Sequence, residues 1–315
     1  MPGQARVVIV GATGTGKTAL ALCMARAAPG RHELVSVDAM AVYRFMDIGT
    51  AKPTPAERAE VPWHLIDIVD PSQSFSVAAF QAEARRAIDG IESRGRVPVL
   101  VGGTGLYHRA VIDSLEIPAR FPELAAELDQ QADRPGGLAE LFSRLGELDP
   151  VAVQRVEPNN RRRIVRALEV TLGTGRPFSS YGPGLLSYPP TTARIIGLEL
   201  DRAELDRRVA VRLDDQLARG FLEEVQGLAR RPGGLSRTAR QAIGYRELLC
   251  HIERAMPIGQ AKADALSRLR AFARRQEAWF RRDPRIVWLR ADRDDLLQAV
   301  GAVISDTSTA GAVRH

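Results

Sequence analysis

The stretch Gly11-Ala-Thr-Gly-Thr-Gly-Lys-Thr18 decides how this chain folds. It follows the apolar run 7–10 and opens the helical stretch 19–28, in the strand, loop and helix order of a phosphate-binding loop. Its glycines permit backbone conformations closed to other residues, so successive N–H groups can converge on phosphate oxygens at the helix N-terminus. The sequence therefore predicts a diphosphate or triphosphate site made of Gly11, Ala12, Thr13, Gly14, Thr15, Gly16, Lys17 and Thr18.

Two side chains of this loop carry its chemistry. Lys17 supplies a positive charge, and Thr18 supplies a hydroxyl ligand for Mg²⁺. Lys17, Lys52 and Lys262 are the only lysines among 44 lysines and arginines. The loop therefore has a lysine in an arginine-rich chain, because a slender ammonium fits beside phosphates where a planar guanidinium would crowd the backbone. The loop leaves open which phosphate ester it holds.

Length and composition bound the class of protein. At 315 residues, 45% hydrophobic and 26% charged, the chain suits a globular protein of one large domain with an insertion or of two modest domains. The net charge of +6 and the pI near 9.8 favour a polyanionic partner, although high arginine usage raises the pI by itself. Cys23 and Cys250 are too few for a metal cluster or a disulfide framework. We expect a cytoplasmic protein with reduced thiols and no membrane span.

Two further strands end in residues that suit a ligand site. The buried run 34–37 ends at Asp38, and ligands of open parallel sheets bind at that edge, so Asp38 and the phosphate loop should share one crevice. Asp38 is then either catalytic or a cap on the following turn. The run 97–101 ends in Gly102-Gly-Thr104 and lacks the acidic residue that a P-loop ATPase has there, which argues against a nucleotide hydrolase. Thr104 either approaches a ligand or lies in a tight turn.

The remaining pattern predicts an α/β fold, a parallel sheet flanked by helices with an all-helical insertion. A further strand with its turn is expected at 63–71, and others at 194–200 and 286–289, with helices at 76–94 and 294–304 and a frayed tail at 307–315. Asp201 and Glu204 predict a capping box for a helix that ends at Gly220. Between residues 117 and 190, proline and glycine punctuate short helical segments. The predicted domains are therefore 1–116 with 191–315, and the helical insertion 117–190.

Basic residues gather in three helices. Arg161, Arg162 and Arg163 follow Asn160 in a first helical turn, where positive charge opposes the helix dipole and an external polyanion would explain it. Arg208 and Arg212 lie on one face of a later helix and point either at an anionic ligand or at solvent. The helix 262–282 has Leu266, Leu269, Phe272, Gln276 and Trp279 on one side and arginines elsewhere, which suits either phosphate contact with base stacking or a plain amphipathic helix.

Other polar residues receive no role from the sequence. Tyr43, Asp47 and Lys52 are as compatible with a structural role as with a functional one, and His64 is expected to be a packing group rather than a ligand.

Five motifs together resemble those of the bacterial tRNA dimethylallyltransferase family. They are GATGTGKT at Gly11, SVDAMAVYRFMDIGTAKP at Ser36, GGTGLY at Gly102, RQAIGYRE at Arg240 and ARRQEAWFRR at Ala273, and their joint order covers nearly the whole chain. The resemblance implies a P-loop kinase-like fold whose helical insertion contacts a tRNA anticodon stem-loop. It also implies transfer of a dimethylallyl group from dimethylallyl diphosphate to N6 of the adenosine 3′-adjacent to the anticodon, with release of diphosphate.

The resemblance assigns roles to individual residues. It implies that Asp38 is the general base, that Thr104 reaches the departing diphosphate, and that Arg212 clamps the diphosphate held with Mg²⁺ by Thr13 to Thr18. Ala39 and Ala41 stand where many members of the family carry Ser and Gln. The implied tRNA contacts are Asp38, Ala39, Met40, Ala41, Asn160, Arg161, Arg162, Arg163, Ile164, Gln241, Ala242, Ile243, Gly244, Tyr245, Arg246, Arg274, Arg275, Gln276, Trp279 and Arg281.

Three rival functions share some of these features. A P-loop kinase of small molecules or nucleosides would use the same loop, but it leaves the absent acidic strand end and the basic C-terminal helix unexplained. An adenylate prenyltransferase would use the same donor with free AMP. A non-catalytic RNA-binding protein would bind RNA without forming a product. We expect a monomeric enzyme.

Overall fold

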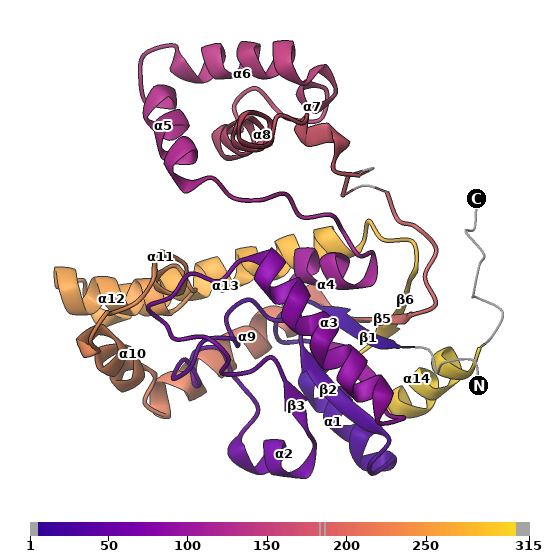
Figure 1. Cartoon of the computed structure of the whole chain (residues 1–315). Helices are drawn as coiled ribbons and strands as arrows, with labels where there is room; N and C mark the ends of the chain where they lie inside the picture. The colour runs from indigo at the N-terminus through magenta and orange to yellow at the C-terminus, as the bar shows by residue number, and fades with distance from the viewer. Residues whose placement is uncertain (1–5, 183, 186, 307–315) are drawn as a thin grey trace. The chain divides into compact units, whose positions relative to one another are not determined.

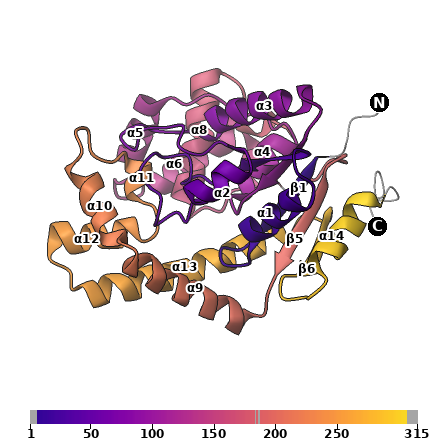
Figure 2. The same cartoon turned by 90° about the horizontal axis from the view of Figure 1, so that it is seen from below.

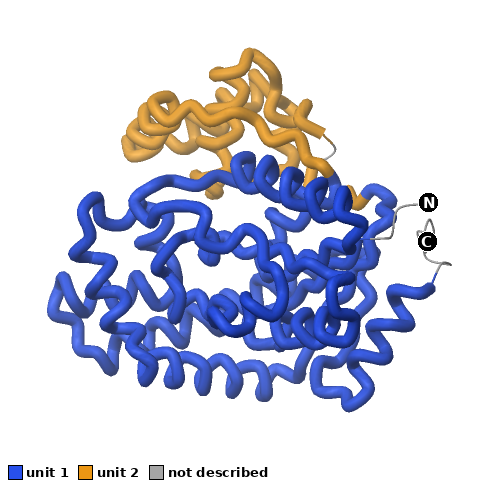
Figure 3. The backbone as a smooth tube through the Cα atoms, turned by 60° about the horizontal axis from the view of Figure 1, so that its bottom comes forward, with its two compact units in different colours: residues 1–113, 189–315 blue, residues 114–188 orange. Residues whose placement is uncertain are grey.

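The computed structural model describes residues 6–182, 184–185 and 187–306, which form two compact units (Figure 3). Unit 2 is Ser114–Tyr188, and unit 1 contains the described residues on either side of it. The sequence placed the insertion at 117–190, within a few residues of unit 2. The expected tail 307–315 lies outside the described residues.

A parallel sheet forms the centre of unit 1. The described strands are ordered β3-β2-β4-β1-β5-β6, and each neighbouring pair is parallel. β1 therefore lies between β4 and β5, and the phosphate loop leaves the middle of the sheet. The strands are β1 (Val7–Gly11), β2 (His32–Ser36), β3 (Trp63–His64), β4 (Val97–Val101), β5 (Arg194–Glu199) and β6 (Ile286–Arg290).

Helices bury both faces of this sheet, which explains why the strand sequences are almost continuously apolar. Alternate residues of β1 enter different cores: Val7 and Ile9 pack with α1 (Lys17–Ala27) and α14 (Leu296–Ser305). Val8 and Val10 pack with α3 (Val77–Ser93) and α4 (Gly105–Ile112) (Figure 1). The Ser76 hydroxyl caps α3 by accepting the N–H of Ala79, at the residue where the predicted helix 76–94 begins.

Additional helices extend unit 1 beyond the sheet. The long α13 (Ile258–Phe280) runs beside α9 (Arg202–Ala218), and α10 (Phe221–Arg230) packs against α12 (Tyr245–Arg254) (Figure 2). The sequence did not predict α2 (Pro55–Glu60), α10, α11 (Arg237–Arg240) or α12.

The predicted capping box of α9 is wrong. Asp201 is the N-cap residue, but its side chain accepts no cap hydrogen bond and instead pairs with Arg290 at 2.7 Å. Glu204 pairs with Arg207 at 2.8 Å and with Arg208 at 2.7 Å. Guanidinium groups are stronger partners for a carboxylate than a backbone N–H, so the arginines displace the cap.

The buried face of α13 also differs from the predicted one. It consists of Ala261, Ala265, Ala273, Gln276 and Phe280. Of the side predicted from the sequence it shares only Gln276, and Leu266, Leu269, Phe272 and Trp279 are only partly buried. The helical spacing of the larger apolar side chains suggested a different face. Small residues line the buried face because α13 lies close to β1, α9 and α12.

Every regular element in the described residues of unit 2 is a helix, in agreement with the predicted all-helical insertion. Its core contains Leu128, Leu141, Leu145, Ile164 and Leu168, each at most 3% exposed. No helix in the described part of the chain has the length and apolar character needed to cross a membrane. The helices of unit 2 are α5 (Pro122–Ala132), α6 (Gly137–Leu148), α7 (Pro150–Val153), α8 (Arg161–Thr174) and the 3₁₀ turn η1 (Phe178–Ser180).

Candidate diphosphate-binding and transfer site

The phosphate loop lies between β1 and α1 and is held by contacts to one carbonyl. The oxygen of Ala12 accepts the Thr15 N–H at 3.3 Å, the Thr15 hydroxyl at 2.9 Å and the Lys17 ammonium at 2.7 Å. Gly16 turns into α1 with a left-handed φ of 89°, a conformation that favours glycine. The loop is thus closed by its own side chains.

Most loop amides remain available to an anion. Within the described residues, the N–H groups of Gly14, Gly16, Lys17 and Thr18 have no hydrogen-bond partner. The N–H of Thr13 differs, because it donates to Gln276 Oε1 at 2.9 Å. A diphosphate would therefore meet the later part of the loop, where helix α1 also presents the positive end of its dipole.

Gln276 of α13 joins the phosphate loop to the Gly102-Gly-Thr104 turn. Besides accepting from Thr13, it donates Nε2–H to the carbonyl of Gly103 at 2.9 Å. A Cβ on Gly103 would lie 2.2 Å from this Nε2, so glycine is required for the contact. Gln276 is only 7% exposed, with both ends of its amide engaged. The structure thus assigns it a positioning role, whereas the sequence expected a tRNA contact.

Asp38 lies two residues beyond the end of β2, beside the turn at Thr104. Its Oδ1 accepts the N–H groups of Met40 at 2.8 Å and Ala41 at 3.3 Å, so the turn-capping role considered from the sequence is present. The N–H of Ala39 donates to Thr104 Oγ1 at 3.2 Å. Asp38 Oδ2 has no partner among the described residues, and the Thr104 hydroxyl retains a proton to donate.

Lys17, Arg212 and Asp38 interact electrostatically across the site. Burial and the Arg212 guanidinium lower the pKa of Lys17 to about 7, while Asp38 opposes this shift. Burial likewise lowers the pKa of Arg212, again against the attraction of Asp38. These two cations thus share one carboxylate in a partly desolvated space. A polyanion placed there would relieve their repulsion.

The two arginines predicted on one face of α9 have different environments. Arg208 Nε donates to Glu204 at 2.7 Å, so this arginine is already paired. Arg212 is half-buried and has no ion-pair partner among the described residues. The structure therefore leaves Arg212 as the candidate anion clamp, the role that the family resemblance implies for it and that helical spacing alone did not distinguish from Arg208.

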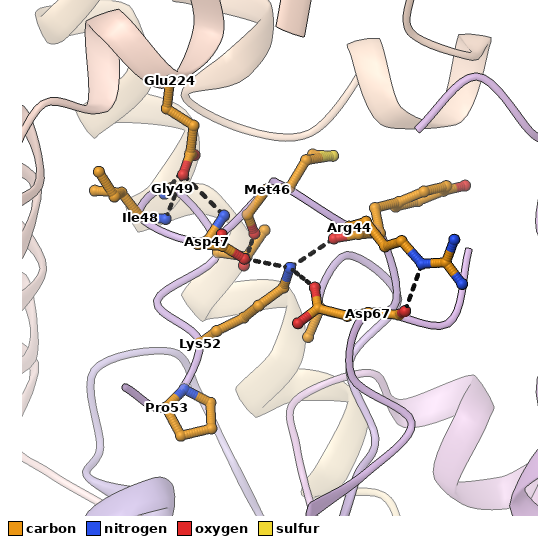
Figure 4. A network of polar contacts seen from close by, with 12 residues as sticks. Arg44, Met46, Asp47, Ile48, Gly49, Lys52, Pro53, Asp67 and Glu224 are labelled. Atoms are coloured by element: carbon orange, nitrogen blue, oxygen red, sulfur yellow. Dashed lines mark hydrogen bonds and ion pairs between the residues drawn. The ribbon is translucent and has the colours of Figure 1, made fainter. Parts of the chain in front are cut away.

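Lys52 organises the loop that follows Asp38, and Figure 4 shows its contacts. Its side chain is 1% exposed, and its ammonium donates to the Tyr43 carbonyl at 2.6 Å, to Asp47 at 2.7 Å and to Asp67 at 2.6 Å. Partial burial works against the Asp67 charge, but hydrogen bonds from Lys52 and Arg58 keep the pKa of that carboxyl below its usual value. Lys52 and Asp47 thus have structural contacts.

Glu224 of α10 holds the same loop from the other side (Figure 4). Its carboxylate accepts the N–H groups of Asp47 at 2.9 Å, Ile48 at 2.7 Å and Gly49 at 3.2 Å. The Tyr245 hydroxyl donates to it at 2.5 Å. Burial and this carboxylate raise the pKa of Tyr245 well above its usual value, so the phenol stays protonated as a donor. No residue pattern in the sequence indicates this contact.

We expect Glu224→Gln to destabilise the fold by about 2–3 kcal/mol. The carboxylate accepts hydrogen bonds from backbone N–H groups with both oxygens, whereas the amide of glutamine would place an NH₂ donor opposite some of these N–H donors. Urea unfolding followed by circular dichroism measures the loss. The matched control is Glu223→Gln, the exposed neighbour in α10, with an expected change near zero. Equal unfolding midpoints for the two variants would remove Glu224 as a loop anchor.

The predicted tRNA contacts of unit 1 divide by exposure. Gln241, Arg246, Arg274, Arg275 and Arg281 are exposed, while Asp38, Ala39, Met40, Ile243 and Trp279 are partly buried. Arg281 also pairs with Glu199 and lies 4.2 Å from the centre of the Trp288 ring. Ala41, Ala242, Gly244, Tyr245 and Gln276 are buried, and their contact with tRNA stays a prediction.

In unit 2 the arginine run at the start of α8 is partly neutralised within the unit. Arg161 pairs with Asp129 at 2.9 Å and with Asp133, and the Asn160 side chain caps the helix by accepting the Arg163 N–H. An external polyanion is therefore not needed to explain Arg161. Ile164 is fully buried and makes no surface contact. Arg162 and Arg163 are exposed, without a side-chain ion pair among the described residues.

The described residues contain no cluster of three or more metal-ligating side chains. His64 pairs with Glu33 at 2.6 Å, in accord with its expected packing role. Thr18 fits Mg²⁺ in another way. This ion prefers a few oxygen ligands completed by substrate phosphates and water, and the half-buried Thr18 hydroxyl has no partner among the described residues.

A phosphate loop at the carboxyl edge of a parallel sheet, coupled to Arg212 and Asp38, defines a P-loop α/β protein that handles a phosphate ester. Residues 41–283 match the sequence profile described as IPP transferase. The chain belongs to the IPP transferase family.

Named relatives agree with this assignment. The tRNA dimethylallyltransferase of Kocuria rhizophila is 46% identical over 98% of this chain and 94% of the relative. That of Roseiflexus castenholzii is 46% identical over 96% of this chain and 97% of the relative.

Solved structures show the same similarity. The full-length tRNA isopentenylpyrophosphate transferase from Bacillus halodurans matches with a TM-score of 0.68 and 35% identity, over 96% of this chain and 97% of that one. A eukaryotic dimethylallyltransferase acting on tRNA matches with a TM-score of 0.77 and 25% identity, over 95% of this chain and 78% of that one. The P-loop kinase-like core predicted from the resemblance thus has its counterpart in this family.

Proposed function

We propose that the chain transfers a dimethylallyl group from dimethylallyl diphosphate to N6 of the adenosine 3′-adjacent to the anticodon of tRNA, releasing diphosphate. The observation that carries this proposal is the joint placement of Lys17 and Arg212, two partly desolvated cations, with a carboxylate at Asp38. A diphosphate would bind the two cations through its negative charge, and an amine could donate its proton to the carboxylate.

The residues divide the chemistry between the leaving group and the nucleophile. As the bond from the allylic carbon to oxygen breaks, charge grows on the diphosphate, where Lys17, Arg212 and the loop N–H groups stabilise it. The Thr104 hydroxyl donates to the same oxygens. The N6 amine forms the new bond to carbon and gives its proton to Asp38, whose Oδ2 is not engaged by the described residues.

Mg²⁺ held by Thr18 would neutralise part of the diphosphate charge when bound. The target base has to leave the stacked anticodon loop to meet Asp38, so we propose base flipping before transfer. The exposed Gln241, Arg246, Arg274 and Arg275 of unit 1, together with Arg162 and Arg163 of unit 2, are the proposed contacts to the RNA. A monomeric, cytoplasmic enzyme remains our expectation.

The direct test is transfer of label from dimethylallyl diphosphate to an unmodified tRNA anticodon stem-loop, with AMP and ATP assayed in parallel. We expect label in the RNA alone. Label in AMP would instead identify an adenylate prenyltransferase. ATP turnover without label transfer would identify a kinase, and RNA binding without either reaction would identify a binding protein.

A further inference from the structure

The backbone of Phe45 is strained, and burial of the side chain does not compensate for this strain. Its φ is 65°, and it is the only aromatic residue among the described non-glycine residues with positive φ. Its exposed fraction is 47%, whereas Leu65, which has the same φ, is 5% exposed and packs in the core. Left-handed backbone is unfavourable for a residue with a bulky side chain, and such strain persists where the surroundings fix it and where function uses it.

The surroundings do fix Phe45. The N–H of Arg44 donates to the Val69 carbonyl at 2.9 Å, and the Arg44 guanidinium donates to the Asp67 carbonyl at 2.9 Å. On the other side Met46 is fully buried and occupies the core position. The ring of Phe45 is therefore held outward at the surface of the loop that begins at Asp38.

A guanidinium covers one side of this ring. Arg231 lies 4.0 Å from the ring centre, and it also contacts Asp70 at 3.5 Å. The neighbouring Arg230 is exposed, as is Arg44. An exposed aromatic ring paired with one arginine, with two further exposed arginines next to the pair in sequence, suits stacking on an unpaired nucleobase and attraction of its phosphates.

We propose that Phe45, supported by Arg231, is a stacking platform for an unpaired base of the tRNA anticodon loop. This inference rests on the proposed tRNA substrate and goes beyond it, because it adds a contact outside the tRNA-binding residues named above. The strained backbone at Phe45 would then serve RNA binding. It presents the ring to RNA, which a glycine at this position could not do.

The test compares Phe45→Gly and Phe45→Leu with the wild-type protein in binding a fluorescent, unmodified anticodon stem-loop. Loss of one base stack is expected to raise Kd by about 5- to 150-fold in Phe45→Gly. The dependence of Kd on salt concentration should stay the same, because no phosphate contact is removed. The melting temperature should not fall, since glycine adopts positive φ without strain.

Ala255→Gly is the matched control. Ala255 is also exposed, with φ of 53°, at the C-cap of α12. This variant should keep the wild-type Kd and melt no earlier than the wild type. Phe45→Leu keeps a side chain but loses the aromatic face, so weakened binding by this variant shows that stacking and not local folding is measured.

A wild-type Kd in both Phe45 variants would overturn the proposal. A changed oligomeric state with unchanged RNA affinity would overturn it too, because this surface would then be an interface between copies of the chain. Label transfer by the wild-type protein is measured alongside. Active wild-type protein with unaffected Phe45 variants rejects this inference alone. Wild-type protein that neither binds nor modifies the stem-loop rejects the proposed function as well.

Discussion

Replacing Asp38 with asparagine is expected to lower the rate of dimethylallyl transfer by about 10²- to 10⁴-fold, because the proposed general base is removed. Asparagine is chosen because its side-chain oxygen can still accept the N–H groups of Met40 and Ala41, which Asp38 Oδ1 accepts now. The turn should therefore survive. Single-turnover label transfer measures the rate, and binding of the stem-loop should remain near the wild-type level.

The control for this variant is Asp47→Asn, which alters another carboxylate of the same loop. Asp47 is 54% exposed and pairs with Lys52, so its replacement should leave the transfer rate near that of the wild type. Asp38→Ala adds information, since it removes the turn contacts as well and should lower the melting temperature. A nearly full rate in Asp38→Asn would reduce Asp38 to a turn-capping residue.

The second large effect is expected from Lys17→Met. Removing the ammonium from the phosphate loop takes away stabilisation of the departing diphosphate and should lower the transfer rate by about 10²- to 10³-fold. Stability should not fall with it at neutral pH. In the free protein this ammonium is disfavoured by burial and by Arg212, and a methionine has no charge to desolvate.

The lowered pKa of Lys17 also predicts how pH acts. Since this pKa is about 7 in the folded protein and 10.5 in an unperturbed lysine, the unfolded chain binds the extra proton between these values. The Lys17 contribution therefore makes the free protein more stable as pH rises from about 7 to 10.5. A bound diphosphate favours the charged form, so donor binding at pH 8.5 should take up a proton, as measured by calorimetry in buffers of different ionisation enthalpy.

Lys262→Met is the matched control for Lys17→Met. Lys262 is 44% exposed and pairs with Asp214 at 2.6 Å on the surface, so its removal should alter neither the rate nor the proton uptake. Full activity of Lys17→Met would take this lysine out of the leaving-group site. Absence of proton uptake by the wild type would mean that Lys17 is already charged before the donor binds.

Local sequence determined the phosphate loop, the strands and the helical character of unit 2. A glycine-rich loop between an apolar strand and a helix requires only neighbouring residues to specify it. Short apolar runs likewise indicated the buried strands, and the punctuated stretch indicated short helices. The family resemblance then supplied the roles proposed for Asp38, Thr104 and Arg212, which no spacing could have supplied.

Only the tertiary structure decided which polar side chains support the site. Two of them, Gln276 and Glu224, contact backbone groups of loops that are distant in sequence. The third, Lys52, contacts a backbone carbonyl of its own loop. Contacts to backbone groups leave no pattern of residue types in the sequence. Arg208 and Arg212 look alike on a helix, but Glu204 pairs with Arg208 alone. The sequence therefore determined where phosphate can bind, because that depends on local backbone. The fold decided which positive charges remain without an ion pair and so can bind phosphate, because ion pairing depends on side chains that the fold brings together in space.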